Sequence, residues 1–207
     1  MLGFGLGAGQ YAARLKAELD RVNWADVERL ADLLYEAWDK GRFVFLLGNG
    51  GSATTASHLA EDLGKNCVRA EDLTAGAGKR LKVMSLTDNV GWITALANDL
   101  GYDQVFLQQL AHFGGEGDLA LAISGSGNSP NVIAAVDWAN RRGLVTFGMT
   151  GFDGGRLKRC QQAGIHVALE DMAMVESIHV CIGHWVVDDL AARVNGLGRY
   201  GGMRDEG

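Results

Sequence analysis

The sequence is poor in the residues that mark several classes of protein. It has one proline and three cysteines, and the cysteines (Cys67, Cys160 and Cys181) form no CxxC pair, which favours a reduced, cytoplasmic protein. No apolar stretch is long enough to span a membrane, and the N-terminal stretch MLGFGLGAGQY lacks the basic segment of a signal peptide. Positive charge is also scarce. The net charge is −6 and the pI about 5.3, so we expect neither nucleic acid nor an anionic membrane as a partner.

Glycine, by contrast, is abundant, with 30 residues in a chain of 207. Without a repeat, glycine at this level indicates tight turns and close backbone approaches rather than disorder. Hydrophobic residues make up 47% and charged residues 21%, as in ordinary globular proteins. The length suits one domain with its own core, so we expect a single domain over residues 1–207 whose tail, 195–207, is mobile.

Hydrophobic periodicity predicts helices that alternate with short strands. Two amphipathic helices come first within residues 1–40, at 11–22 and 25–40. Five short apolar runs predict buried strands at 42–47, 81–86, 118–123, 144–150 and 165–169. The helices expected after them are 53–64, 90–98, 131–143, a short one ending near 163, and 174–194, with a loop at 65–80. This alternation predicts an α/β fold whose five-stranded parallel sheet is covered by helices on both faces.

The segment SGSGNSPN (124–131) follows the third predicted strand and precedes a helix. In open parallel sheets, ligands bind at the carboxyl ends of the strands, where this loop lies. The loop offers the hydroxyls of Ser124, Ser126 and Ser129, and its glycines let backbone N–H groups converge. Ser129 suits the N-cap and Pro130 the first helical position, so the loop leads into a helix N-terminus, which favours an anion. A plain strand-to-helix turn would use similar residues, but three hydroxyls at this place favour phosphate binding.

A second glycine-rich loop, GNGGS (48–52), follows the first predicted strand. It is neither a Walker A motif, which needs Gly-Lys-Ser/Thr, nor a GxGxxG dinucleotide fingerprint, so we expect no nucleotide cofactor. Alone it is a weak signal, because many α/β proteins need glycine there for tight packing. Together the two loops predict a phosphorylated ligand held by hydroxyls and backbone amides, without a lysine.

The order of the motifs resembles that of a known family. GNGGSA with His58 behind it, then TDN, ANDLGYD, SGSGNS, TGFDGG and finally ESIHVCIGH, resemble the SIS (sugar isomerase) domain family, and within it the sedoheptulose 7-phosphate isomerases. The resemblance covers nearly the whole chain. It implies a three-layer αβα sandwich of flavodoxin-like type and a homotetramer with sites near the subunit interfaces. It also implies an aldose–ketose isomerase that acts on a phosphorylated sugar.

The resemblance further assigns residues to the substrate. The family's phosphate loop matches Ser124, Ser126 and Ser129 of this chain, with Ser52 nearby, and Gly125 is expected to contact the substrate as part of the same loop. The family's sugar contacts match four more: Asn49, Gly50, Gly51 and Asp88. The family usually has threonine where this chain has Gly125, so one hydroxyl contact is missing.

Two predicted helices carry residues suited to acid–base chemistry. His58 and Asp62 share one face of the first, and Glu176 and His184 lie near one face of the last. In the resembling enzymes these four positions surround a zinc ion, which implies Zn²⁺ here, although Asp62 replaces a glutamate and Glu176 a glutamine. Two histidines and two carboxylates suit a divalent metal. Because eight helical residues span about 12 Å, Glu176 and His184 meet one ion only if both lean inward, if the helix begins later, or if subunits share the site.

Interconversion of an aldose and a ketose moves a proton between C1 and C2 through an enediol, which needs a base and a group that stabilises the oxyanion. We expect Asp62, Glu176 and His184 to be catalytic, and either carboxylate could be the base. Glu61 is a rival, but it points about 100° away from Asp62 on the helix, and His179 falls on another face and is expected to be structural. The alternative function is a non-catalytic SIS-domain protein, either a sugar-phosphate sensor or a protein-binding factor that assembles replication initiators. The His/Asp/Glu/His set discriminates, because such relatives can keep the phosphate loops without it.

Overall fold

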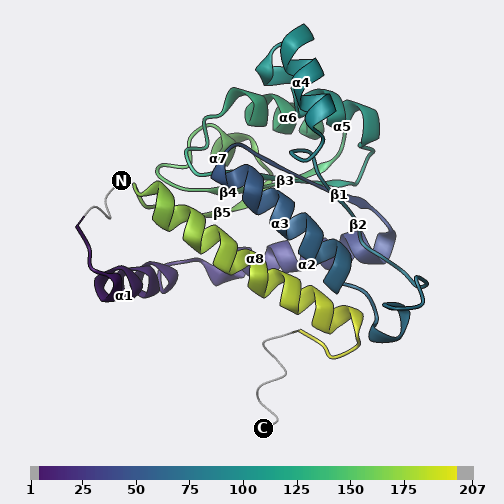
Figure 1. Ribbon diagram of the computed structural model, residues 1–207, viewed down its shortest axis with the longest axis horizontal. Helices are drawn as coiled ribbons and strands as arrows, with labels where there is room; N and C mark the ends of the chain where they lie inside the picture. Colours follow the sequence, from purple (N-terminus) through teal and green to yellow (C-terminus); the bar gives the residue numbers. More distant parts are fainter. Residues whose placement is uncertain (1–4, 200–207) are drawn as a thin grey trace.

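The computed structural model describes residues 5–199, which form one five-stranded sheet with helices on both faces (Figure 1). The strands are β1 (Phe43–Gly48), β2 (Lys82–Ser85), β3 (Leu119–Ser124), β4 (Val145–Thr150) and β5 (Ala163–His166). All pairings are parallel, in the order β2-β1-β3-β4-β5. This is the flavodoxin-like order, so the predicted α/β class and parallel sheet are confirmed.

The helices in residues 5–199 include the predicted ones. They are α1 (Ala8–Leu19), α2 (Trp24–Lys40), α3 (Gly51–Asn66), α4 (Val90–Asp99), α5 (Leu107–Phe113), α6 (Pro130–Arg141), α7 (Leu157–Cys160) and α8 (Met172–Val194), with 3₁₀ turns η1 (Ala70–Asp72) and η2 (Tyr102–Gln104). The ends of α2 show how local sequence sets these bounds. The Asn23 side chain accepts the N–H of Ala25 at the start, and Gly41, with φ 64°, closes the helix in a left-handed conformation.

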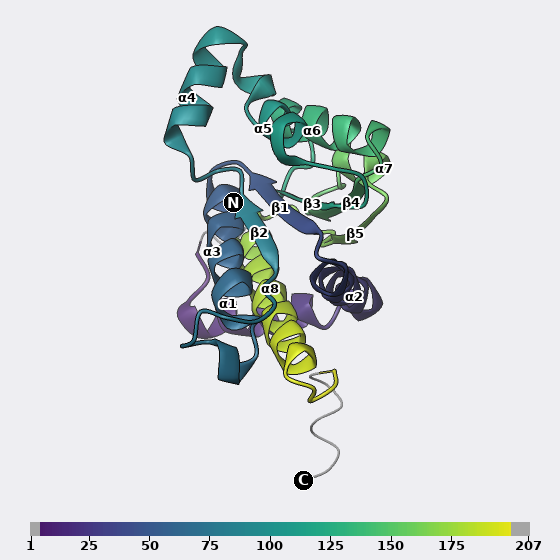
Figure 2. The ribbon, with the colours of Figure 1, turned by 90° about the vertical axis from the view of Figure 1, so that its right-hand side faces the viewer.

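Alternating strand residues divide the core into two layers. Along β1, Val44 and Leu46 pack with α2, α3 and α8, whereas Phe45 and Leu47 pack with α5, α6 and α7. Figure 2 shows the sheet edge-on between these two sets of helices, with α4 standing away from the rest. Each fully buried side chain of this kind contributes roughly 1.5–3 kcal/mol, so the alternation fixes which face of the sheet each helix covers.

One helix was not predicted from the sequence. The segment between α4 and β3 contains η2 and α5, and the apolar side chains of Val105, Phe106 and Leu110 are buried in the second layer. The predicted loop at 65–80 also contains a short helical turn, η1. These short elements have too few residues to show a helical period in the sequence. The positions of α5 and η2 depend on packing against α6, and η2 also packs against α4.

The last strand begins earlier than predicted. β5 spans 163–166 rather than 165–169, and α7 ends at Cys160. The shift follows from the pairing of Gly164 with Gly148 of β4: the Gln161 side chain lies against both glycines, where any β-carbon would collide with it. Glycine at both positions therefore lets the chain enter the sheet directly after α7.

The predicted mobile tail, 195–207, extends beyond the described residues, which end at 199. Within the described part, the Asn195 side chain accepts the N–H of Ala70 at 3.0 Å and Arg199 forms an ion pair with Glu28 at 3.5 Å. Residues 195–199 are therefore held against the fold. Between residues 5 and 199, no helix combines the length and the apolar character needed to cross a membrane.

Candidate active site

Both glycine-rich loops lie at the carboxyl edge of the sheet, directly after neighbouring strands. β1 pairs with β3 up to Gly48 and Ile123, and the chain leaves β1 toward the layer of α3 but leaves β3 toward the layer of α6. In open α/β sheets, ligands bind at such a switch point. The positions of the two loops therefore agree with the prediction of one shared binding site.

The first loop needs glycine for two separate reasons. Gly50 has φ 56° and ψ −123°, a conformation that side chains strongly disfavour. Gly48 lies so close to the next strand that a β-carbon would stand 2.7 Å from the Ile123 carbonyl oxygen. This close approach places Ser52, which is only 4% exposed, in the first turn of α3 behind the loop.

In the second loop, serine hydroxyls are arranged as hydrogen-bond donors. The Ser124 and Ser126 Oγ atoms accept the N–H groups of Gly127 (3.2 Å) and Asn128 (3.3 Å). Each hydroxyl therefore keeps its own proton for a ligand oxygen. Ser129 is the N-cap of α6, but its side chain makes no capping hydrogen bond, so this hydroxyl is also available. The backbone N–H groups of Gly127 and Asn128 are thus used within the loop. Here the donors for a ligand are serine hydroxyls, whereas the sequence predicted both hydroxyls and backbone amides.

The turn after β4 supports the second loop from behind. Gly151 donates its N–H to the Gly125 carbonyl at 2.8 Å, and Leu157 donates to the Gly127 carbonyl at 2.9 Å. Gly127 has φ 65°, and any β-carbon there would collide with the Gly154 carbonyl. The TGFDGG motif therefore fixes the shape of the serine loop and does not need to contact a ligand itself.

The remaining predicted sugar contact, Asp88, lies between β2 and α4. Its carboxylate accepts the Ser57 hydroxyl of α3 and the Thr87 hydroxyl, the latter at 3.1 Å. Asp88 is exposed, so these two bonds orient a carboxylate that still faces solvent beside the first loop.

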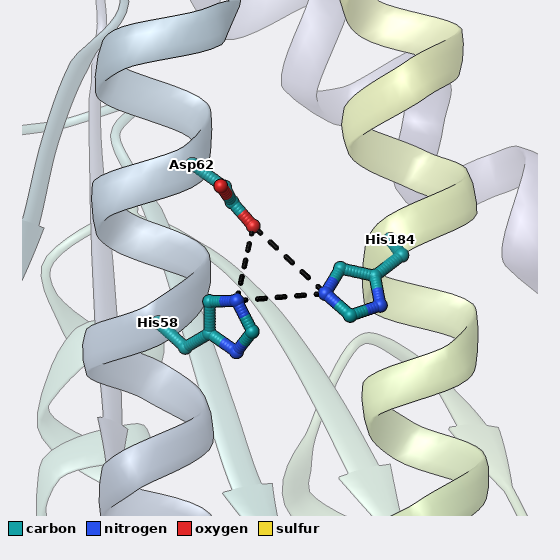
Figure 3. Close-up of side chains that lie close together, drawn as sticks. All are labelled: His58, Asp62 and His184. Carbon is teal, nitrogen blue, oxygen red and sulfur yellow. Dashed lines mark hydrogen bonds and ion pairs between the residues drawn. The ribbon is translucent and has the colours of Figure 1, made fainter.

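Two histidines and one carboxylate meet between α3 and α8 (Figure 3). Asp62 Oδ2 lies 3.3 Å from His58 Nε2 and 3.9 Å from His184 Nε2, and the two Nε2 atoms are 3.5 Å apart. The two histidine side chains are about half exposed, at 48% and 51%, whereas that of Asp62 is 15% exposed. The cluster therefore opens to solvent on one side and is closed by the aspartate on the other.

A close helix contact produces this meeting. Gly183 of α8 faces Leu59 of α3, and a β-carbon on Gly183 would lie 2.5 Å from Leu59 Cδ2. Gly183 directly precedes His184, and Leu59 directly follows His58. The contact between them therefore sets the separation between the two histidines. Figures 1 and 2 both show α3 and α8 side by side along this stretch.

The cluster fits a tetrahedral zinc ion. With zinc–ligand bonds of about 2.0–2.1 Å, tetrahedral ligand atoms are about 3.3 Å apart. The three measured separations are 3.3, 3.5 and 3.9 Å, so small side-chain movements suffice to bind one ion. Three protein ligands with an open fourth position are also the arrangement of catalytic rather than structural zinc sites.

Glu176 lies outside this group of three. Its carboxylate rests against the backbone of Gly51, where a β-carbon would stand 2.5 Å from Glu176 Oε1. α8 begins at Met172, before Glu176, so the rise of the helix separates Glu176 from His184. The structure thus brings together His58, Asp62 and His184 of the predicted ligand set and places Glu176 at the first loop.

Comparisons with known proteins show the family and the fold of the chain. The family model described as "SIS domain" matches residues 10–151. The chain belongs to the SIS domain family. It is 38% identical to a phosphoheptose isomerase of Chlorobium phaeobacteroides over 91% of this chain and 81% of that relative. Two solved phosphoheptose isomerase structures have TM-scores of 0.76: GmhA from Neisseria gonorrhoeae (29% identity, 86% of this chain and 91% of that one) and the protein from Francisella tularensis (26%, 87% and 92%).

A methionine of α8 lies against Gly125, the position at which the resemblance implies a threonine. Any β-carbon on Gly125 would collide with the Met172 sulfur, which lies at the first residue of α8. The Asp171 N-cap before it is buried and paired with Arg14 at 3.0 Å, so the start of α8 is anchored. A thioether therefore lies against the serine loop at Gly125, a position that carries no hydroxyl.

Glu61 and His179, the alternatives to the predicted site residues, both lie outside the cluster of His58, Asp62 and His184. Glu61 pairs with Lys65 at 3.2 Å and lies on the exposed face of α3, outside the cluster of this SIS domain. His179 is buried, with Nε2 3.4 Å from the Thr150 carbonyl oxygen, and burial lowers its pKa to about 4. His179 is therefore neutral near pH 7 and part of the core, as predicted.

Three residues that support the site have no role predicted from the sequence: Asn131, Tyr102 and Gly183. Asn131 and Tyr102 both hydrogen-bond to Asn49. Asn131 ends the SGSGNSPN segment and Tyr102 belongs to ANDLGYD, so each lay inside a recognised motif without a role of its own. Their contacts depend on the adjacency of β1, β3 and η2, which the sequence does not reveal.

Proposed function

We propose that this protein is an aldose–ketose isomerase that interconverts sedoheptulose 7-phosphate and a heptose 7-phosphate. The observation that carries the proposal is the pairing of a hydroxyl-rich loop at the carboxyl edge of the sheet with a His/Asp/His cluster between α8 and α3, the helix that begins at this edge. Its similarity to phosphoheptose isomerases over most of the chain supports the same reaction. The non-catalytic alternative is not favoured, because His58, Asp62 and His184 are assembled.

The substrate is proposed to lie along α3. Its phosphate would accept the hydroxyls of Ser124, Ser126 and Ser129 and the N-terminal dipole of α6. From Gly51 to His58, α3 advances about 10 Å, a span that a heptose phosphate can bridge. The reacting end of the sugar would then lie between Glu176, which rests at the first loop, and the histidine cluster further along α3, with Asp88 beside the chain of hydroxyls.

The chemistry requires a proton transfer between C1 and C2 and stabilisation of the enediol oxyanion. Glu176 is proposed as the base, because within residues 5–199 its carboxylate makes no hydrogen bond or ion pair and faces the first loop. In the absence of an ion, Asp62 would orient both histidines and His184 could exchange a proton with a sugar oxygen through Nε2, the atom that would become a metal ligand when Zn²⁺ is bound. His58, Asp62 and His184 would hold Zn²⁺, which supplies Lewis-acid stabilisation of the oxyanion when bound.

The proposal is tested by incubating the protein and Zn²⁺ with sedoheptulose 7-phosphate and following the aldose by NMR. Replacing Glu176 with glutamine should lower kcat by about 10²–10⁴-fold, the usual contribution of a general base, with little change in substrate binding. Glu61→Gln is the matched control, since Glu61 lies one residue from Asp62 but outside the cluster. Absence of aldose with the unaltered protein would overturn the function; full activity of Glu176→Gln would instead move the base to Asp62.

We also propose self-association, as the resemblance to homotetrameric enzymes implies. Helix α4 supports it: the helix is rich in apolar residues, none of its residues is buried, and Val90 is 69% exposed. A second copy that covers α4 would remove this apolar surface from water. Light scattering after size exclusion should give the mass of four chains, and Val90→Glu should lower it.

We also propose a reducing compartment such as the cytoplasm, which suits the three free cysteines.

A further inference from the structure

We propose that Asn131 is a positioning residue that fixes the side-chain amide of Asn49, so that Asn49 offers the substrate a single N–H donor and no acceptor. The inference rests on the proposed function, in which Asn49 contacts the sugar. It assigns a role to a buried residue behind the site and states the chemistry that the substrate must present at Asn49.

The two amides form a reciprocal pair between the loops. Asn49 Nδ2 donates to Asn131 Oδ1 at 2.8 Å, and Asn131 Nδ2 donates to Asn49 Oδ1 at 2.9 Å. Asn131 is the second residue of α6 and is 1% exposed, whereas Asn49 is half-buried at the end of β1. Asn131 is therefore out of reach of a ligand, and its side chain joins the serine loop to the first loop through Asn49.

A backbone group decides which way both amides point. A reciprocal amide pair would look the same if both side chains turned over, exchanging oxygen and nitrogen. The N–H of Val132, however, lies 3.0 Å from Asn131 Oδ1, and a backbone N–H only donates. The oxygen of Asn131 must stay on that side, so Asn49 must turn its Nδ2 toward it. The N-terminus of α6 thus fixes the orientation of an amide on another strand.

Tyr102 then uses the last acceptor site of Asn49. Its hydroxyl donates to Asn49 Oδ1 at 3.1 Å, and with Asn131 this gives the amide oxygen two donors, which is its full capacity. Among residues 5–199, one hydrogen of Asn49 Nδ2 has no acceptor. A substrate must therefore present an oxygen lone pair at this point, as a sugar hydroxyl or carbonyl does. A group that only donates, such as an ammonium in an amino sugar, finds no partner there.

The inference is tested with a double-mutant cycle of Asn49→Ala and Asn131→Ala, in which kcat, KM and the Kd of sedoheptulose 7-phosphate are measured. Because Asn131 acts only through Asn49, we expect Asn131→Ala to raise KM and Kd about tenfold, or about 1.4 kcal/mol, with little change in kcat. In the Asn49→Ala background it should have no further effect. Tyr102→Phe, at an exposed position that tolerates change, should raise KM by a smaller factor.

Asn140→Ala is the matched control. Asn140 lies on the same helix and also uses both ends of its amide, donating to the Cys160 carbonyl at 2.7 Å and accepting the Thr146 hydroxyl at 2.8 Å. It should lower stability but leave KM and kcat unchanged. Effects of Asn49→Ala and Asn131→Ala that multiply, or an equal rise of KM in the Asn140→Ala control, would overturn the inference. If the protein bound the sugar without turning it over, the proposed function would fail, and the same cycle on Kd would still decide the role of Asn131.

Discussion

Replacing Gly183 with alanine should separate the two histidines of the candidate metal site without altering any of the three candidate ligands. The new β-carbon would lie 2.5 Å from Leu59 Cδ2, 3.0 Å from Cδ1 and 3.2 Å from Cγ. Carbon atoms in contact normally stand about 3.5–4.0 Å apart, and Leu59 is 4% exposed, with little room to move. α3 and α8 must therefore separate by about 1 Å. The Nε2 atoms of His58 and His184, now 3.5 Å apart and slightly wider than the tetrahedral spacing of about 3.3 Å, would move further from that spacing.

Stability alone would not reveal this change. Overpacking costs about 1–3 kcal/mol, but alanine is favoured over glycine within a helix by about 1 kcal/mol. The net loss, measured by urea unfolding, should fall between zero and about 2 kcal/mol. Zinc affinity is the sharper readout, because supporting residues around a metal site usually change it by about 10–100-fold. Competition with a chromophoric chelator at pH 7 should show a loss of that size for Gly183→Ala.

A second substitution tests the same helix contact. Leu59→Ala removes the colliding atoms, so adding it to Gly183→Ala should return zinc affinity to near its original value. The double variant should nevertheless be less stable, since a buried leucine truncated to alanine costs about 2–5 kcal/mol. Leu59→Ala alone is the control and should bind zinc almost normally. If Gly183→Ala bound zinc as tightly as the unaltered protein, the helix contact would not set the histidine spacing.

The other predictions concern buried groups and the serine loop. Burial holds the pKa of His179 at about 4, below its unfolded value of about 6.5, so the unfolded chain binds more protons between these values and stability falls as the pH is lowered through them. Urea unfolding should show that this residue contributes about 2 kcal/mol to the loss between pH 7 and pH 5, and His179→Phe should remove that part. Gly125→Thr should weaken sugar-phosphate binding in calorimetry about tenfold, since the side chain collides with Met172, and adding Met172→Ala should restore part of it. Burial also raises the pKa of Cys67 to about 12, so iodoacetamide at pH 8 should label exposed Cys181 but not Cys67, as mass spectrometry would show.

The fold could be predicted because its signals are local. Runs such as FVFLL before GNGGS, and the three-and-four spacing of apolar residues in α2, identify strands and helices without knowledge of their neighbours. Helix α5 could not be predicted, because LQQLAHF is only two turns long and is helical through its packing against α6. The early start of β5 depends on Gly148 and Gly164 facing one another, a pairing that exists only once the sheet has formed.

The site could be predicted only where one element carries it. His58 and Asp62 share a turn of α3, so their spacing alone places them together. The approach of His184 depends on the contact of Gly183 with Leu59, and that contact requires the crossing of two helices far apart in the chain. Glu176 was grouped with the metal ligands through resemblance, but about 12 Å of helix lies between it and His184. The amide pair of Asn49 and Asn131 likewise needs β1 beside β3.

The distribution of charge explains why phosphate and reacting carbons are proposed at opposite ends of the site. Asp62, Asp88 and Glu176 line it, and none of its assigned residues is lysine or arginine. A phosphate about 8 Å from a carboxylate would be repelled by about 2 kcal/mol per unit charge at an effective dielectric constant of 20. Along α3, about 16 Å of helix separates Gly51 from Asp62, so a phosphate held by the hydroxyls and the N-terminus of α6 would lie far from that carboxylate, whereas Glu176 rests against Gly51. A divalent ion between His58 and His184 would balance Asp62 at the other end, where negative charge develops on the sugar oxygen.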